Sequence, residues 1–307
     1  MRAIILLLAI APFVQSDSLQ CIQIPDSQIK IGYFTRIPAN SSEPAPIPPN
    51  FNCIFNVKVP PNVYAHVQLE NQLKGGNDLI TVRDAELMRT LVSSRNTGNL
   101  QFYVFPNTTT TFQVTTKSVD VGSKMRMVIY YQKVPSPLIS YLKNNTDDLR
   151  YFFLNDLQLN SYKQPVTEVG DEKLVLTIAQ SHWDADLFDN YYVIDGDFNQ
   201  SKGVYHLSNF LNQNFISSGN KLTVLGLDNL VSQSALIFTP LSQAINYDSM
   251  YAMTTYYERQ FITIKANGGK KSALTVIAKT TNETMILGMN YDGVGFIFSE
   301  SLIKCEK

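Results

Sequence analysis

The chain of 307 residues carries 25 lysine and arginine residues against 26 aspartate and glutamate residues. This near balance lacks the basic field that attracts nucleic acid or an anionic membrane, so it argues against both as principal partners. Charged residues make up 17% of the chain and aromatic residues 11%, which is typical of a folded globular protein and not of a disordered one.

The first residues predict a secretory signal peptide. Arg2 provides a positive start, the run from Ala3 to Val14 is apolar apart from one proline, and small residues offer a cleavage site after Ser16. The run is shorter than the roughly 20 residues that span a bilayer. The last residues, 302–307, lack the hydrophobic tail of a lipid anchor. We therefore expect removal of residues 1–16 and a secreted, extracellular protein without a transmembrane segment.

Asn-x-Ser/Thr sequons occur at five positions, and behind a signal peptide such sequons predict N-glycosylation. A glycan requires an exposed attachment site, so we expect these positions on surface loops or strand ends. The sequons are at Asn40, Asn107, Asn144, Asn199 and Asn282.

The chain has three cysteines, and in an oxidising compartment two of them should pair. Cys21 and Cys53 bracket a loop-rich segment, which favours this pair. Closing such a loop of about 30 residues stabilises a protein by roughly 3–4 kcal/mol in the chain-entropy model. Cys305 is then left over, either as a buried, inert thiol or as the link of a disulfide-bonded dimer.

Residues 17–52 are rich in proline and predict loops, with one short edge strand within 29–34. Apolar and polar residues then alternate over 53–59 and again over 63–70, on either side of Pro60-Pro61-Asn62. This pattern predicts an antiparallel hairpin. Its second strand directs four side chains away from the core, either toward a partner or only toward solvent: Tyr64, His66, Gln68 and Glu70.

Four further strands are predicted before a proline-containing linker near residue 135, and only 84–94 has helical character. Turn residues separate these strands, as in an all-β sandwich. The strands are expected over 79–84, 99–105, 109–115 and 124–132.

The second half repeats this style, with one short helix expected over 140–149. The domains are thus predicted as 17–134 and 138–307, although the assignment of the tail beyond residue 240 stays open. Strands are expected over 173–178, 191–194, 204–207, 221–225, 235–238, 260–265, 273–280, 284–289 and 294–298.

Several stretches resemble CUB domains. In the second half, residues 188–196 and 215–224 are similar to two consecutive strand-and-turn elements of that family. In the first half, the segments 52–57, 64–69 and 77–84 resemble the CUB-like family expanded in nematodes. The resemblance implies two tandem β-sandwich domains of jelly-roll type, with Cys21–Cys53 as the N-terminal disulfide. The second disulfide of ordinary CUB domains is missing from both halves.

The resemblance also implies a calcium site, because many CUB domains bind Ca²⁺ through a glutamate and two aspartates. The ion needs six to eight oxygen ligands, so carboxylates would require carbonyls and water as well. The alternative is that these are solvated loop carboxylates. By motif position, the candidates are Glu70, Asp78 and Asp120 in the first domain and Asp189 and Asp228 in the second.

Trp183 is the single tryptophan, and it lies among several aspartates. It is a candidate for stacking on a sugar, or a half-buried residue at a sandwich edge. The aspartates are a candidate glycosidase pair, but exposed turns are the default explanation for them. They are Asp184, Asp186, Asp189, Asp195 and Asp197.

No spacing of the three histidines predicts zinc, and no nucleophile motif is present. We therefore predict a secreted, non-enzymatic CUB-like glycoprotein without catalytic residues. The resemblance implies that it binds an extracellular protein or glycan in innate immune defence or a stress response. The alternatives are a structural component of the extracellular matrix and a secreted hydrolase.

Overall fold

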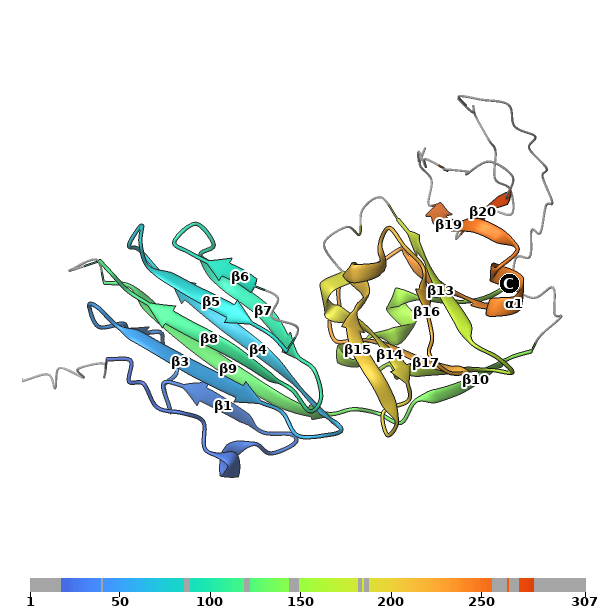
Figure 1. Ribbon diagram of the computed structural model, residues 1–307. Coiled ribbons are helices and arrows are strands. Elements are labelled where there is room, and N and C mark those ends of the chain that lie inside the picture. Colours follow the sequence, from blue (N-terminus) through green and yellow to red (C-terminus); the bar gives the residue numbers. More distant parts are fainter. Residues whose placement is uncertain are drawn as a thin grey trace, which may run out of the picture. The chain divides into compact units, whose positions relative to one another are not determined.

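The computed structural model describes residues 18–39, 41–85, 89–118, 122–143, 149–181, 184, 188–255, 264 and 271–278. The chain divides into two compact units, Met1–Lys133 and Val134–Lys307 (Figure 1). Strands dominate both units, and the one α-helix of the described residues is the short α1 (Leu241–Ala244). The predicted all-β class is therefore confirmed.

Two antiparallel sheets form the first unit in the described residues. Sheet A has the order β1-β9-β4-β7, with β2 also paired to β9. Its strands are β1 (Phe34–Ile37), β2 (Ala45–Pro46), β4 (Val63–Gln72), β7 (Gly98–Val104) and β9 (Lys124–Lys133). Sheet B has the order β3-β8-β5-β6, formed by β3 (Asn52–Lys58), β5 (Leu79–Arg83), β6 (Arg89–Val92) and β8 (Thr109–Thr115).

The two alternating strands around Pro60-Pro61-Asn62 are present, but the prediction that they form a hairpin is wrong. β3 pairs with β8 in sheet B, whereas β4 pairs with β7 and β9 in sheet A. The connection crosses between the sheets at Asn62, whose φ of 60° is left-handed. Alternation predicts which face of a strand is buried, and it does not identify the neighbouring strand.

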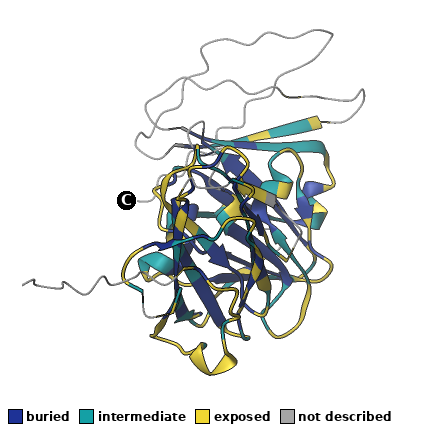
Figure 2. Ribbon diagram, turned by 90° about the vertical axis from the view of Figure 1, so that its left-hand side faces the viewer, coloured by how far each residue is buried: buried dark blue, intermediate teal, exposed yellow. Residues whose placement is uncertain are grey.

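The facing sides of sheets A and B make one hydrophobic core. Figure 2 shows the buried residues of the chain in dark blue, most of them on strands. The predicted inward residues of β4 are completely or almost completely buried: Val63, Ala65, Val67 and Leu69. Phe55 and Phe112 fill the core from sheet B. The Cys21–Cys53 disulfide is confirmed; it ties the N-terminal segment to β3.

Two expected elements of the first half differ in the structure. The edge strand expected within 29–34 lies later, as β1, because register with β9 begins only at Phe34 and Tyr130. The helical character expected over 84–94 is wrong in its described part, since β6 pairs with β5 there. Packing against a sheet edge has outweighed the local pattern in this segment.

The second unit also contains two sheets in its described part. Sheet C has the order β10-β12-β17-β14-β15, formed by β10 (Leu138–Leu142), β12 (Val166–Gly170), β14 (Tyr191–Gly196), β15 (Ser201–His206) and β17 (Lys221–Gly226). Sheet D has the order β11-β18-β13-β19-β20, with β16 paired to β13. Its strands are β11 (Arg150–Phe153), β13 (Leu174–Gln180), β16 (Phe215–Ile216), β18 (Ala235–Pro240), β19 (Tyr247–Thr255) and β20 (Lys271–Ala278).

Side chains from both sheets share the main core of this unit, among them Leu176 and Phe238 of sheet D and Val193 and Val224 of sheet C. The second unit is thus a β-sandwich as well, as predicted. Short 3-10 helices interrupt the unit's strands at η2 (Leu154–Leu157), η3 (Leu159–Ser161), η4 (Phe188–Asn190) and η5 (Leu207–Phe210).

The helix expected over 140–149 is wrong in its described part, because β10 runs to Leu142 in parallel pairing with β12. Strands β10, β11, β12 and β19 were not predicted. Strand β12 is buried on both faces, so its sequence lacks a clear two-residue alternation, which explains why it was missed. The strands expected over 260–265, 284–289 and 294–298 lie outside the described residues, apart from the single residue 264.

Candidate functional site

Aromatic rings cross the outer face of sheet A in one continuous row, which we call the aromatic row: Phe34, Tyr130, His66 and Tyr103. The register sets these residues side by side, because Phe34 pairs with Tyr130, Tyr130 with His66, and His66 with Tyr103. All four lie on the side of the sheet opposite the core. Side chains directly opposite each other on neighbouring strands contact one another, so strand pairing alone builds the row.

At the centre of the row the rings stack against one another from strand to strand. His66 stacks on Tyr103 with centroids 4.9 Å apart and planes inclined by 11°, and on Tyr130 at 5.9 Å and 29°. Phe34 is 6.0 Å from Tyr130 and tilted by 54°. Phe34 is 49% exposed, and Tyr130 and His66 are half-buried, whereas Tyr103 is buried. The accessible part of the row therefore lies over β1, β9 and β4.

His66 is held in place by its neighbours in the sheet. Its Nε2 donates a hydrogen bond to Gln101 Oε1 on β7. Burial lowers the pKa of His66 below its usual value, and the hydrogen bond to Gln101 offsets only part of this effect. The imidazole is therefore neutral at pH 7, and the centre of the row is an uncharged ring surface.

Polar side chains lie on both sides of the aromatic row along the strands. Tyr64 Oη donates to Gln132 Oε1 at 2.6 Å on one side. On the other side, Arg126 Nη2 and Glu70 Oε2 form an ion pair of 3.0 Å across β9 and β4. Exposed aromatic surface bordered by polar groups is the usual composition of a binding surface.

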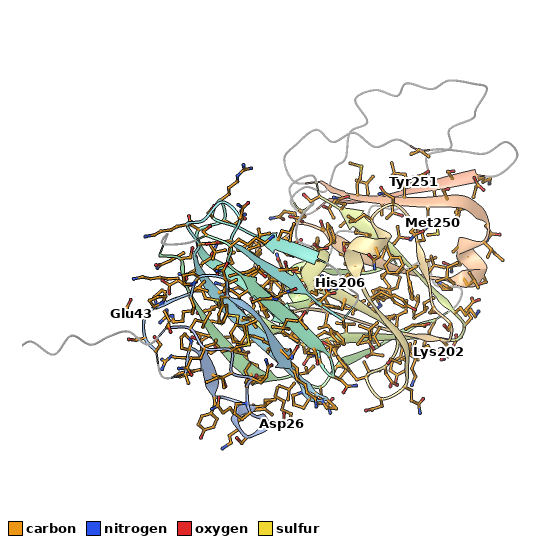
Figure 3. All side chains as sticks on the ribbon, turned by 60° about the vertical axis from the view of Figure 1, so that its left-hand side comes forward. Asp26, Glu43, Lys202, His206, Met250 and Tyr251 are labelled. Carbon is orange, nitrogen blue, oxygen red and sulfur yellow. A yellow bond between two sulfur atoms is a disulfide. The ribbon has the colours of Figure 1, made fainter. Side chains whose placement is uncertain are left out.

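A hollow of about 320 Å³ adjoins the row at the edge strand β1. One wall comes from the segment around η1 (Asp26–Gln28), which carries the Asp26 labelled in Figure 3. The other wall comes from Tyr33, Phe34 and Arg36, and Lys30 also lines the hollow. The Arg36 guanidinium carbon lies 4.4 Å from the centre of the Phe34 ring.

The candidate calcium ligands of the first unit have other partners. Glu70 pairs with Arg126. Asp78 is fully buried, and its carboxylate accepts hydrogen bonds from Lys117 N, Ser118 N and Ser123 Oγ at 3.0, 3.1 and 2.7 Å. Burial by itself raises the pKa of Asp78, but these hydrogen bonds outweigh it and hold the pKa below its usual value.

Asp78 thus joins the turn after Gly75 to the segment between β8 and β9, and a Cβ at Gly75 would clash with its carboxylate. Asp120 lies outside the described residues. In this structure the oxygens of Glu70 and Asp78 have a cation and three backbone or hydroxyl donors as partners.

In the second unit, the side chain of Asp189 is exposed on η4, while Asp228 is fully buried after β17. Burial raises the pKa of Asp228 to about 6, although Asn190, Tyr191 and the Leu230 backbone donate to it. No three histidine, cysteine, aspartate or glutamate side chains of the described residues are arranged to hold a metal ion.

The aspartates considered as a glycosidase pair lie on different elements where they are described, with Asp189 on η4 and Asp195 at the end of β14. Asp184 is bound to the segment Ser232–Ser234, Asp195 to Ser218, and Asp197 to Lys221 at 3.3 Å. Asp186 and Trp183 lie outside the described residues. These contacts are those of structural turn carboxylates.

The two CUB-resembling stretches of the second half meet in the structure. They form β14 and β17, which pair antiparallel, and Ser218 N donates to Asp195 Oδ1 at 2.8 Å. Ser217 Oγ accepts from Leu174 N at 2.7 Å and donates to Gly219 O at 2.6 Å. The polar residues of this motif therefore shape a turn at the end of the sandwich.

Two of the predicted glycosylation sites fall on described, exposed positions. Asn107 lies in the turn between β7 and β8 with a φ of 59°, and Asn199 lies in the turn between β14 and β15. Asn40, Asn144 and Asn282 lie outside the described residues, as does Cys305. Among the residues that the structure describes, no helix is long and apolar enough to cross a membrane.

The aromatic row was only partly accessible to sequence reasoning. The alternation over 63–70 directed His66 outward, and the alternation over 124–132 set Tyr130 on the polar side of its strand. Phe34, Tyr103 and Arg36 were missed as functional candidates. Their common signal is outward parity on strands that pair with β4 or β9, and it requires knowledge of the register.

Comparison with known proteins supports the CUB-like resemblance for the first unit. Residues 16–135 match the family model described as the CUB-like domain. The match covers the whole aromatic row and ends at residue 135, at the start of the second unit. CUB-like domains are typically extracellular binding modules without catalytic activity. No curated protein matches the chain in sequence.

Solved structures with some similarity include the CUB1-EGF-CUB2 domains of rat MASP-1, at 10% identity and a TM-score of 0.28. The comparison covers 71% of this chain and 99% of that one. The CUB1-EGF-CUB2 domain of human MASP-1/3 follows at 10% identity and 0.27, covering 67% and 98%. Tripeptidyl peptidase 2 reaches 7% identity and 0.26, covering 69% of this chain and 22% of that chain. Scores this low establish no common arrangement of whole chains.

Proposed function

We propose that this protein is a secreted, non-enzymatic binding glycoprotein whose contact surface is the outer face of sheet A. The observation that carries the proposal is the aromatic row, with Phe34, Tyr130 and His66 accessible on one sheet face. Tyrosine rings combine apolar area with a polar tip, and few rotatable bonds have to be ordered when a partner binds. Such rings are enriched among the residues that dominate binding energy.

The ligand that suits this surface is an extracellular glycan. The C–H faces of a sugar ring are apolar and stack on aromatic rings, while its hydroxyl groups require hydrogen-bonding side chains nearby. Gln68 lies next to the row on β4, and Gln101 borders it on β7. Recognition of microbial or host-surface glycans would place the protein in innate immune defence or a stress response, as the CUB-like resemblance implies.

Two features support the extracellular part of the proposal. The first unit contains a disulfide, and disulfides persist in oxidising compartments. Asn107 and Asn199 are exposed, as glycosylation requires.

A disulfide-linked dimer through Cys305 stays a prediction, and migration on non-reducing gels tests it. Calcium binding also stays a prediction, because Asp120 is not among the described residues.

The test is a screen of the purified glycoprotein against immobilised glycans and intact microbial cells, with and without Ca²⁺. We expect binding that Tyr130→Ala weakens about tenfold or more, since the variant removes the ring at the centre of the accessible surface. Tyr162→Ala is the matched control, because Tyr162 is fully exposed in the second unit.

Equal loss of binding in both variants, or binding unaffected by Tyr130→Ala, would show that the outer face of sheet A is not the binding surface. Absence of binding to every glycan and cell type would favour a structural role in the extracellular matrix.

A further inference from the structure

The charged side chains that line the hollow beside β1 are all positive. Lys30 and Arg36 line it, and no aspartate or glutamate is among its lining residues in the described part of the chain. Neither cation forms an ion pair within the described residues. The nearby Asp26 belongs to η1 but does not line the hollow. The hollow therefore presents positive charge on a protein whose overall charge is close to zero.

One nitrogen of the Arg36 side chain, Nε, is buried without a hydrogen-bond partner in the described part of the chain. The guanidinium carbon of Arg36 lies over the Phe34 ring, 4.4 Å from the ring centre, in a cation–π contact. The buried Nε lies out of reach of a ligand, so an oxyanion pairs with the terminal nitrogens of the guanidinium group, and an oxyanion is the partner that suits a planar guanidinium best.

The uncharged residues that line the hollow provide the aromatic rings and hydrogen-bonding groups of a sugar site. Tyr33 and Phe34 are 66% and 49% exposed and offer rings for stacking. Ser27 and Gln28 also line the hollow and offer hydrogen-bonding side chains. The size of the hollow, about 320 Å³, is at the lower end of ligand sites in proteins, which suits one or two sugar units.

We infer that the hollow and the adjoining end of the aromatic row bind an acidic oligosaccharide, with a sulfate or carboxylate group on Arg36 and Lys30. The sugar ring stacks on Phe34, and the neighbouring units extend over Tyr130. This inference rests on the proposed function and names the ligand class for the same face. The charge complementarity between the two cations and the anionic group selects acidic over neutral sugars.

The experiment measures binding of the full glycoprotein to a heparin-derived hexasaccharide and to the same oligosaccharide after desulfation and N-acetylation. We expect the sulfated form to bind at least about tenfold tighter, with an affinity that falls as NaCl is raised. Arg36→Gln and Lys30→Gln should each weaken binding of the sulfated form by about tenfold. Free inorganic sulfate should compete only weakly, because it lacks the stacking ring.

Matched controls lie on sheet B. Arg83→Gln and Lys58→Gln remove the same charges from exposed positions on β5 and β3, and they should leave the affinity unchanged. If Arg36→Gln does not fold, Lys30→Gln still decides the question, because Lys30 is exposed. Equal losses in all four variants would show non-specific charge attraction and would overturn the inference.

Failure of the inference is distinguishable from failure of the proposed function. If the sulfated and neutral forms bind equally, and Tyr130→Ala weakens both, sheet A is a binding face but the acidic ligand class is wrong. If neither oligosaccharide binds, the inference is overturned, and the wider screen of glycans and cells decides the proposed function separately. If inorganic sulfate alone competes fully with the sulfated oligosaccharide, the hollow binds only an anion, and the sugar assignment is also overturned.

Discussion

One carboxylate oxygen of Asp184 accepts hydrogen bonds from Ser232 Oγ, Gln233 N, Ser234 N and Ser234 Oγ, at 2.7 to 2.8 Å. The residue is 2% exposed, so water does not replace these contacts. Hydrogen bonds to a charged group are stronger than neutral ones, and the donors would be left buried without a partner if the carboxylate were removed. Asp184 therefore determines the conformation of the segment that leads into β18.

This geometry makes a prediction about stability. Asp184→Ala should lower the free energy of unfolding of the second unit by about 3 kcal/mol or more, because several buried donors lose their acceptor. Asp184→Asn should cost less, since it keeps one acceptor oxygen. Asp189→Ala is the control, because its side chain is exposed, and it should change stability by less than about 0.5 kcal/mol. Chemical denaturation measures all three.

An unchanged unfolding midpoint in Asp184→Ala would contradict the structural role. It would also reopen the reading of the aspartates as a hydrolytic pair, for which a free carboxylate is required.

At the scale of elements, the alternation in β3 and β4 shows which structural features a sequence pattern predicts and which it does not. It predicted both strands and the core-facing residues of each, because burial repeats with the two-residue period of a strand. It did not predict the burial of Tyr64, which was assigned to the outer face and is 1% exposed. The pairing was wrong, because Pro60-Pro61-Asn62 connects two sheets instead of closing a hairpin. A proline and asparagine turn is compatible with both connections, and the long-range partners β8 and β9 decide between them.

The candidate site depends on those long-range partners even more than the fold does. His66 was identified as outward-facing, yet its significance comes from Tyr130 and Tyr103 on either side. These residues are distant in sequence and meet only through strand register. Arg36 and Phe34 lie on a four-residue edge strand whose position was predicted a few residues too early. Short edge strands have few residues from which a pattern can be recognised.

At the scale of the whole molecule, each unit has a hydrophobic core of its own. The core of the first unit runs from Leu19 to Tyr131, and the main core of the second from Leu142 to Phe238. The disulfide Cys21–Cys53 belongs entirely to the first. We therefore propose that the units, predicted as domains over 17–134 and 138–307, fold separately.

Removing the disulfide tests this proposal. Cys21→Ala with Cys53→Ala opens a loop with a sequence separation of 32 residues, and we expect a loss of about 3–4 kcal/mol in the first unit. Scanning calorimetry should show one transition moving to lower temperature while the other stays unchanged. A matched shift of both transitions, or a single transition in the wild type, would show that the two units unfold together.

The central claim is that the outer face of sheet A is the binding surface, and hydroxyl-radical footprinting with the heparin-derived hexasaccharide tests it most directly. At saturating oligosaccharide, oxidation of Phe34, Tyr33 and Tyr130 should fall severalfold, while the fully exposed Tyr162 should react as before. Bound oligosaccharide with unchanged oxidation of Phe34 and Tyr130, or with protection confined to the second unit, would contradict the claim.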